Sequence, residues 1–376
     1  MDPHAAAALL KSWALEAGFD RAGVATLEPA ATGEAFVRWI ERGDQAGMGY
    51  LSRRVEARLA PGTIIPEARS ALCVALQYHP LSNKDGEPGD PEGDLWPRVA
   101  RYARGRDYHD VMGERLEALE DRILAAFPGT ASRRYVDTGP VLERELAARA
   151  GLGAVGKNTN LLHPEAGSWF LLGELFLTLD LAPDVPLADL CGSCTRCLEA
   201  CPTGALPAPY HLDSNRCISY WTIEHRGAFP PEAREMVGTW VFGCDVCQEV
   251  CPWNSAPAGA SHPELALPDE RAGLDLIQLL LLSRDEYVER FRGSPMKRPK
   301  REGLQRNAAV AMGNRRDPRY VPALATALRE ATPAVRAPAA WALGRIGGPD
   351  ARRLLAEALD VEADEAVKAE IRTALT

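Results

Sequence analysis

Eight of the nine cysteines in this chain lie in one region, between residues 191 and 251. The first four follow the spacing C-x₂-C-x₂-C-x₃-C-P, in the tract CGSCTRCLEACPTGAL. This spacing is typical of bacterial ferredoxins with two [4Fe–4S] clusters, in which the fourth cysteine binds the other cluster. The remaining four are divided between the tracts NRCISYW and GCDVCQEVCPWN. Exchange of the fourth ligands predicts one cluster on Cys191, Cys194, Cys197 and Cys251, and a second on Cys201, Cys217, Cys244 and Cys247.

Clustered cysteines in a chain without an export signal indicate metal or redox chemistry rather than disulfides. Two zinc sites built from C-x₂-C steps are the alternative. Zinc leaves unexplained the tandem third cysteine and both Cys-Pro pairs. The ninth cysteine, Cys73, lies in the apolar tract SALCVALQY, and we expect it to be a buried small side chain rather than a ligand.

The composition is that of an ordinary globular protein, with 46% hydrophobic and 25% charged residues among 376. Its formal net charge of −9 argues against a nucleic-acid binder unless basic residues are concentrated locally. The first residues lack the features of a signal peptide. The most apolar runs are interrupted by acidic residues or are shorter than the roughly 20 residues that a membrane span needs. We therefore expect a cytoplasmic monomer with no membrane partner.

The residues ahead of the cysteines alternate between helical and strand-like patterns. GVAT and SALCVALQY read as strands, DYHDVMGERLEALEDRILAAF as an amphipathic helix, and RYVDTGPVLERELAARAGLG as strand, turn and helix. This order predicts an α/β or α+β domain over residues 1–182, followed by a ferredoxin-like module over residues 183–258. No G-x-G-x-x-G follows a strand and no G-x-x-x-x-G-K-[ST] is present, so neither a nicotinamide nor a nucleoside triphosphate site is supported.

The last part of the chain, residues 259–376, repeats itself. The tract QRNAAVAMGN aligns with RAPAAWALGR at a shift of 31 residues, and VKAEIRTAL is a third partial copy. A period of this size, with small residues along helix faces, predicts a HEAT-like α-solenoid. Such repeats usually bind macromolecules, and the alternative is a cap that only stabilises the domain before it.

A basic stretch lies within this repeat region. Residues 290–320 contain ten basic and two acidic side chains, although the whole chain is acidic. A run of charge is often only a solvated face, but beside a repeat of the binding type it favours a polyanionic partner. The contacts that we predict for that partner are Lys297, Arg298, Lys300, Arg301 and Arg306.

Several tracts, taken in order, resemble the epoxyqueuosine reductase family. They are RYARGRDYHDVM, YVDTGPVLERELAARAGLGAVGKN, HPEAGSWFLLGELFL, CGSCTRCLEACPTGAL, RCISYWTIEHRG and FGCDVCQEVCPWN, and they cover most of residues 1–255. The resemblance implies an oxidoreductase that converts epoxyqueuosine to queuosine at the wobble position of tRNA, the last step of queuosine biosynthesis. It also implies cobalamin in the N-terminal domain, reduced by an external electron donor through the two clusters.

The resemblance also implies site residues. The family's cobalamin contacts fall on Arg58, Asp137, Leu161, Leu172, Ser219, Asp245 and Val246. Its proton donor falls on Asp137, in the turn of YVDTGP, where an apolar corrin face would favour the neutral carboxyl that an acid requires. Without the resemblance, Asp137 would be read as a turn-forming residue before Thr-Gly-Pro.

Two other kinds of protein remain compatible with these tracts. A corrinoid reductive dehalogenase shares cobalamin and two clusters, but resembles exported proteins with twin-arginine leaders, and this N-terminal tract has none. A ferredoxin-type electron carrier with an interaction scaffold is the non-enzymatic alternative, and it predicts that no cobalamin binds.

Overall fold

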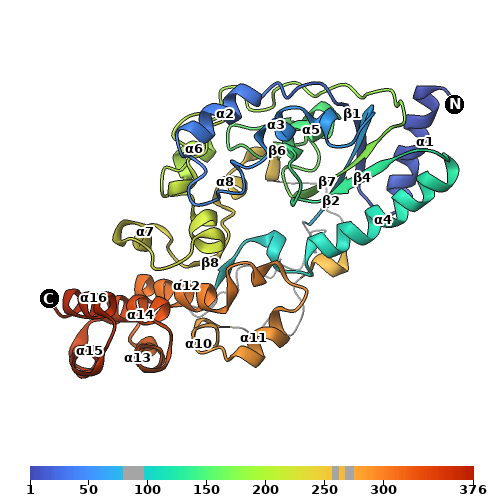
Figure 1. The fold of residues 1–376 in the computed structure, drawn as a ribbon. Coiled ribbons are helices and arrows are strands. Elements are labelled where there is room, and N and C mark those ends of the chain that lie inside the picture. The colour runs from blue at the N-terminus through green and yellow to red at the C-terminus, as the bar shows by residue number, and fades with distance from the viewer. Residues whose placement is uncertain (79–96, 256–261, 267–274) are drawn as a thin grey trace. The chain divides into compact units, whose positions relative to one another are not determined.

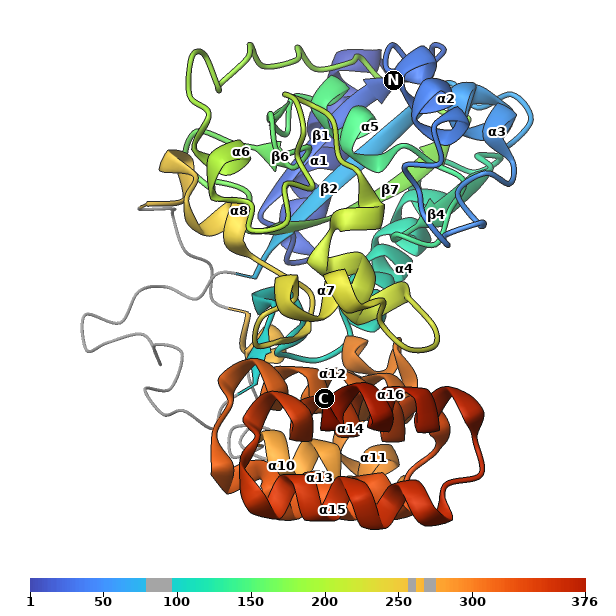
Figure 2. The same cartoon turned by 90° about the vertical axis from the view of Figure 1, so that its left-hand side faces the viewer.

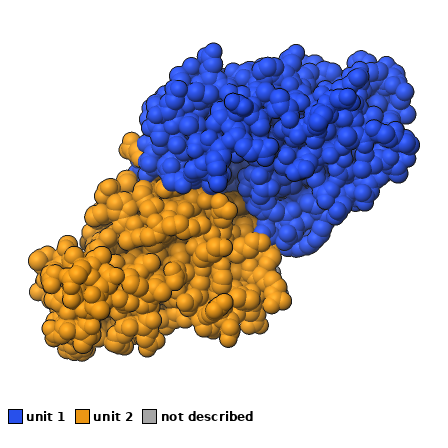
Figure 3. Space-filling view, in the orientation of Figure 1, with its two compact units in different colours: residues 1–82, 105–215, 245–266 blue, residues 83–104, 216–244, 267–376 orange. Residues whose placement is uncertain are grey.

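The computed structural model describes residues 1–78, 97–255, 262–266 and 275–376. It divides into two compact units, coloured separately in Figure 3. Unit 1 comprises residues 1–82, 105–215 and 245–266, and unit 2 comprises residues 83–104, 216–244 and 267–376. The cysteine-rich segment is thus shared between the two units. The domain boundary predicted after residue 258 lies outside the described residues.

Unit 1 is built on a four-stranded antiparallel sheet (Figure 1). Its strands, in spatial order, are β1 (Arg21–Thr26), β2 (Ser70–Gln77), β7 (Phe170–Leu177) and β4 (Ser132–Tyr135). All eight residues of β2 are buried, which is expected of a central strand covered on both faces. The strands predicted from GVAT and SALCVALQY are therefore confirmed.

Helices pack on both faces of this sheet. On one face lie α1 (Pro3–Glu16) and α4 (Tyr108–Ala126), and Met112 and Leu116 of α4 pack over Gly173 of β7. On the other face lies α5 (Glu143–Arg149), whose Leu146 and Ala147 share a buried cluster with Cys73. Cys73 is fully buried in β2, as expected for a small core side chain.

The remaining elements of unit 1 are short. A two-stranded sheet, β5 (Ala154–Val155) and β6 (Leu161–Leu162), follows α5. The helices α2 (Gly33–Glu41) and α3 (Val55–Leu59) come between β1 and β2, and α6 (Arg196–Ala200) and α8 (Val246–Glu249) carry or adjoin the cysteines. The strand, turn and helix predicted around YVDTGP are confirmed as β4, the turn at Asp137, and α5.

Unit 2 contains the predicted helical repeat (Figure 2). The helices α12 (Lys300–Arg315), α14 (Pro333–Ile346) and α16 (Glu365–Leu375) pack side by side, and α13 (Val321–Glu330) packs with α15 (Gly348–Val361) as a second layer. Small residues allow this close approach: a Cβ added to Gly313 would lie 2.5 Å from the Trp341 ring. The two repeated tracts fall on α12 and α14, as the 31-residue shift predicts.

Shorter elements complete unit 2. The helices α10 (Leu276–Leu280) and α11 (Arg284–Phe291) precede the repeat, and α7 (Pro231–Met236) follows the π-helical turn η4 (Tyr220–Glu224). A parallel pair joins β3 (Arg98–Val99) to β8 (Trp240–Phe242). Among the described residues of the whole chain, we find no helix with both the length and the apolar character that crossing a membrane requires.

Candidate functional site

The four thiols predicted to bind the first cluster lie in one neighbourhood of unit 1. Cys197 is on α6 and Cys251 follows α8, and these two helices pack against each other. Burial raises the pKa of the Cys197 thiol, and the negative charges of Cys191, Cys251 and Cys194 raise it further. Burial likewise raises the pKa of Cys251, to which Cys191 and Cys194 also contribute. The fold therefore brings Cys251 to the three cysteines of the first tract.

These thiols are grouped without converging on one point. In the described part of the chain, no three His, Cys, Asp or Glu side chains gather closely enough to hold a single metal ion. In a four-iron cluster each thiolate binds its own iron, so the ligands stand apart. Cysteine binds iron as the deprotonated thiolate. The four side chains therefore have the chemistry that a [4Fe–4S] cluster requires.

Hydrogen-bond donors point at the cysteine sulfurs in unit 1. The backbone N–H of Lys157 donates to Cys191 Sγ at 3.3 Å, and that of Ala205 donates to Cys201 Sγ at 3.3 Å. Asn160 Nδ2 lies 3.8 Å from Cys247 Sγ. Hydrogen bonds to ligand sulfurs help to set the reduction potential of an iron–sulfur cluster. The donors thus fit clusters on these cysteines.

The second predicted set of ligands is divided between the units. Cys201 and Cys247 belong to unit 1, whereas Cys217 and Cys244 belong to unit 2. Their grouping around one cluster rests on the sequence spacing and stays a prediction.

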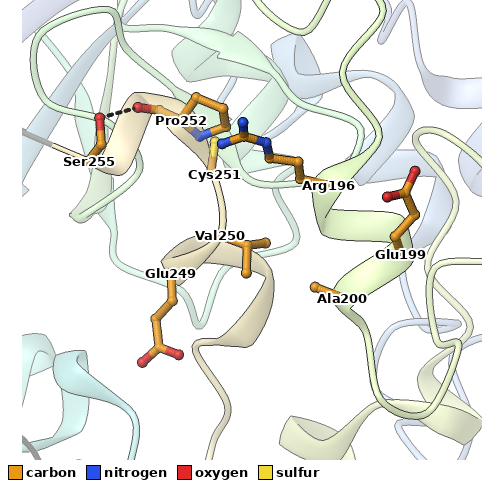
Figure 4. Close-up of a pocket in the computed structure, with 8 residues that line it drawn as sticks. All are labelled: Arg196, Glu199, Ala200, Glu249, Val250, Cys251, Pro252 and Ser255. Atoms are coloured by element: carbon orange, nitrogen blue, oxygen red, sulfur yellow. Dashed lines mark hydrogen bonds between the residues drawn. The ribbon is translucent and has the colours of Figure 1, made fainter.

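A surface hollow opens beside Cys251 (Figure 4). It has a volume of about 570 Å³ and is lined by Arg196, Glu199, Ala200, Glu249, Val250, Cys251, Pro252 and Ser255. Figure 4 shows Ser255 Oγ donating to the Pro252 carbonyl, which closes the turn after Cys251. The hollow brings solvent to one side of the first thiol group.

Asp137, the predicted proton donor, occupies the turn between β4 and α5. Its φ of +58° is in the left-handed region, which non-glycine residues rarely adopt. The backbone N–H of Asp137 donates to Glu143 Oε1 at 2.5 Å, and Tyr108 Oη donates to Asp137 Oδ2 at 2.8 Å. The Asp137 side chain is 61% exposed, so its carboxyl is held in a strained turn and presented to open space. Strained residues of this kind cluster at functional sites.

The His109 ring lies between the carboxyl of Asp137 and the buried carboxyl of Asp107. Its Nε2 lies 3.5 Å from Asp137 Oδ2, and its Nδ1 lies 2.8 Å from Oδ1 of the buried Asp107, the residue that caps α4. Burial alone would lower the pKa of His109, but its hydrogen bonds to Asp107 and Asp137 raise it to about 9. His109 is therefore a cation at neutral pH, and the surroundings of Asp137 are more polar than the sequence led us to expect.

Two carboxyls lie behind the Asp137 turn. Glu174, fully buried in β7, has a pKa well above the usual range, first because of burial and then because of the charge of Glu143. Burial, and next the charge of Asp137, raise the pKa of Glu143 to about 8. Both carboxyls are thus harder to ionise than a free carboxyl, which disfavours negative charge behind Asp137.

Four of the seven predicted cobalamin contacts adjoin this turn or the core beside it. Arg58 on α3 donates to the carbonyls of Gly139 and Val141, at 3.3 and 3.2 Å, and so supports the Asp137 turn. Leu161 is buried in the apolar cluster that α5 covers, and Leu172 of β7 packs against the same cluster.

Ser219 lies in the second cysteine tract, and Asp245 and Val246 lie in the third. Asp245 is buried and precedes α8, which Val246 begins. Ser219 precedes the η4 turn in unit 2. The structure assigns no cobalamin contact to any of the seven residues, and these contacts stay predictions.

Arg306 must be withdrawn from the predicted RNA-binding residues. It is only 2% exposed, and its guanidinium donates to the carbonyls of Trp221, His225 and Gly227 at 2.8–3.1 Å. Burial lowers the pKa of Arg306 to about 9. A side chain committed in this way has no donor to offer a phosphate, so the prediction for Arg306 was wrong. The Arg306 side chain instead joins η4 and the residues after it to α12.

The other predicted RNA contacts lie nearer the surface. Lys297, Arg298 and Lys300 are exposed and Arg301 is half-buried. Arg298 pairs with Glu224 through two hydrogen bonds of 3.0 Å, and Arg301 donates to the Leu282 carbonyl. These two arginines therefore also have structural partners.

Sequence reasoning did not assign a role to Tyr108, His109 or Lys157. The tracts RDYHD and AVGKN were available as signals, because both belong to the resemblance. What was missing was the fold, which carries the start of α4 to the Asp137 turn and Lys157 to the first cysteine loop.

Protein-family models match three successive parts of the chain. A 4Fe-4S double cluster binding domain matches residues 190–254, and HEAT repeats match residues 298–376. With the thiol group described above, the first match makes this chain an iron–sulfur protein of the double-cluster class, as the cysteine spacing predicts. The third model, epoxyqueuosine reductase QueG, matches residues 58–138.

Whole-length comparisons are more specific. An epoxyqueuosine reductase from Xanthomonas campestris is 40% identical over 349 residues, which cover 92% of this chain and 98% of the relative. An epoxyqueuosine reductase from Bacillus subtilis is 38% identical over a region that covers 87% of this chain and 85% of the relative. The chain belongs to the epoxyqueuosine reductase family, a family of oxidoreductases.

Solved structures agree with this assignment. A crystal structure of an epoxyqueuosine reductase with an epoxyqueuosine-modified tRNA-Tyr stem loop matches with a TM-score of 0.90 and 34% identity, over 98% of this chain and 97% of that one. A Bacillus subtilis epoxyqueuosine reductase, described with its catalytic aspartate loop swung out of the active site, matches with the same score, identity and coverage.

Proposed function

We propose that this chain reduces epoxyqueuosine to queuosine at the wobble position of tRNA, with cobalamin and two [4Fe–4S] clusters as cofactors. The observation that carries the proposal is the agreement, over 98% of the chain, with an epoxyqueuosine reductase crystallised with its modified tRNA stem loop. Residues 1–182 would hold cobalamin, residues 183–258 the two clusters, and residues 259–376 part of the tRNA.

The residues around the Asp137 turn fit a large polar cofactor. Arg58 Nε is buried, and within the described residues it has no hydrogen-bond partner. The apolar side chains of Leu161 and Leu172 lie in the adjoining cluster. We propose that these residues hold cobalamin together with Asp137, Ser219, Asp245 and Val246. When bound, cobalamin would supply the strongly reducing metal centre, and the clusters would supply single electrons.

Removal of the epoxide oxygen as water consumes two electrons and two protons. In our proposal the Asp137 carboxyl delivers a proton to the substrate, because it stands exposed on a turn that Tyr108 and Glu143 hold in place. Asp107 fixes His109 through Nδ1, so the protonated Nε2 faces Asp137 and can return a proton to it. The raised pKa values of Glu143 and Glu174 disfavour negative charge beside Asp137, which would otherwise oppose its ionised state after proton transfer.

Reconstitution tests this function directly. Protein prepared without oxygen and supplied with iron and sulfide is expected to change the visible spectrum of added cobalamin on binding. With a chemical reductant it should then convert epoxyqueuosine in tRNA to queuosine, detected by mass spectrometry of the released nucleosides. A protein loaded with clusters that binds no cobalamin and yields no queuosine would instead be an electron carrier.

The exposed basic residues give a prediction about tRNA. We expect Lys297→Glu combined with Lys300→Glu to weaken tRNA binding about tenfold or more, and to lower the slope of log affinity against log salt by about 2, because each lysine paired with a phosphate contributes about 1. A tRNA titration at several salt concentrations measures both quantities. These two residues are chosen because both are exposed lysines of the basic stretch.

The matched control reverses two exposed arginines elsewhere in unit 2, with Arg352→Glu and Arg372→Glu. It changes the net charge by the same amount and should leave the salt slope nearly unchanged. Equal effects of the two double variants would mean that the basic stretch acts only through overall charge.

A further inference from the structure

Lys157 contacts the first cysteine loop at three points, and the proposed reaction gives it no function. Its backbone N–H donates to Cys191 Sγ at 3.3 Å. Its side-chain ammonium donates to the Gly192 carbonyl at 2.6 Å and to the Cys194 carbonyl at 3.0 Å. A single residue thus places a hydrogen-bond donor on a ligand sulfur and a positive charge on the turn that joins two ligands.

The same turn is also held by a carboxylate. Asp189 accepts from the backbone N–H groups of Cys191 and Gly192, at 3.1 and 3.3 Å, and Tyr210 Oη donates to it at 3.2 Å. Those backbone hydrogen bonds, chiefly that from Cys191, lower the pKa of Asp189. The Tyr210 N–H donates in turn to the Lys157 carbonyl at 3.0 Å. The loop therefore already has an anchor of its own, and Lys157 adds charge rather than only support.

We propose that the charge of Lys157 raises the reduction potential of the cluster on Cys191, Cys194, Cys197 and Cys251. This inference rests on the proposed function, which places a cluster on these four cysteines. It goes beyond that function by naming a residue that sets the reduction potential of the cluster. It concerns a one-electron step, in which the oxidised cluster gains one electron from an external reductant and no bond to Lys157 forms or breaks.

The physical reason is electrostatic. A [4Fe–4S] cluster with four thiolates is negatively charged, and reduction adds one further negative charge. A fixed cation nearby stabilises the reduced form more than the oxidised form, so the potential rises. Asp189 opposes this effect but remains the same in every Lys157 variant, and Arg196 beside Cys251 adds to it. Because Lys157 is half-buried, water screens its charge only in part.

The test is a potentiometric titration followed by electron paramagnetic resonance on the full-length protein with its clusters. Lys157→Met keeps the length of the side chain and removes the charge, whereas Lys157→Arg keeps the charge. At the midpoint potential of the wild-type first cluster, we expect Lys157→Met to lower the ratio of reduced to oxidised cluster about tenfold, a shift of about 59 mV for a one-electron couple. Lys157→Arg should stay close to the wild type.

Two controls separate this inference from its alternatives. Lys11→Met removes a lysine of the same unit that pairs with Asp184, and it should leave the potential unchanged. Cys217→Ala, which removes a predicted ligand of the other cluster, isolates the first signal. Iron content is measured on every sample.

Three results would overturn the proposal or its basis. Full iron content with an unshifted potential in Lys157→Met would refute the redox function of Lys157 while leaving the cluster in place. Loss of the first cluster in Lys157→Met but not in Lys157→Arg would show that the ammonium only holds the loop, which also overturns the proposal. Wild-type protein that takes up no iron would refute the cluster assignment itself.

Discussion

Asp137→Asn is expected to lower turnover about 100-fold to 10,000-fold, the range that a positioned acid contributes, while both clusters and cobalamin remain bound. The amide keeps the shape of the side chain and can still meet Tyr108 Oη, but it has no proton to transfer to the substrate. Single-turnover reduction of epoxyqueuosine tRNA measures the loss, with iron content and the cobalamin spectrum as checks on loading.

Asp110→Asn is the matched control. Asp110 lies exposed in the first turn of α4, near Asp137, and the substitution makes the same change from carboxylate to amide. Turnover near that of the wild type is expected for this variant. If fully loaded Asp137→Asn also turned over at the wild-type rate, Asp137 would not be the acid, and His109 would become the candidate because its protonated ring lies beside it.

Cys251→Ala is expected to destroy the cluster held by Cys191, Cys194 and Cys197, and turnover with it. Cys251 lies far from these residues along the chain, but the packing of α6 against α8 brings its thiol to theirs. Iron analysis and electron paramagnetic resonance should show that one cluster is lost or converted and that the other persists.

Two further cysteine variants make this result specific. Cys201→Ala should damage the other cluster, since its sulfur is predicted to bind there although it belongs to the first tract. Cys73→Ala removes a thiol from the sheet core and should leave both clusters intact. If Cys251→Ala instead removed the cluster of Cys244 and Cys247, the predicted exchange of ligands would be refuted.

Spacing and periodicity predicted the parts of this protein whose information is local. Three cysteine tracts indicated a double-cluster domain, and a 31-residue shift indicated paired helices, because ligand spacing and helix packing both leave regular patterns in a sequence. The strand of SALCVALQY could be recognised in the same way, since a buried central strand is apolar along its whole length.

Contacts between distant segments could not be predicted in this way. Arg306 was counted with its basic neighbours, although α12 turns its guanidinium inward to three carbonyls. Charge counting treats every arginine as exposed, and only tertiary packing shows which one is buried. Tyr108 and His109 were missed for the same reason, because their partner Asp137 is brought to them by the sheet.

The hollow beside Cys251 has a consequence for handling the protein in air. Its volume of about 570 Å³ is ample for dissolved dioxygen to reach that side of the thiol group. Once oxidative damage strips the iron, the side chains of Cys191, Cys194 and Cys197, which are only half-buried, are open to oxidation to sulfenic and then sulfinic acid. The second of these products is irreversible in most proteins. Inactivation in air would therefore pass from a stage that iron and sulfide can repair to one that they cannot.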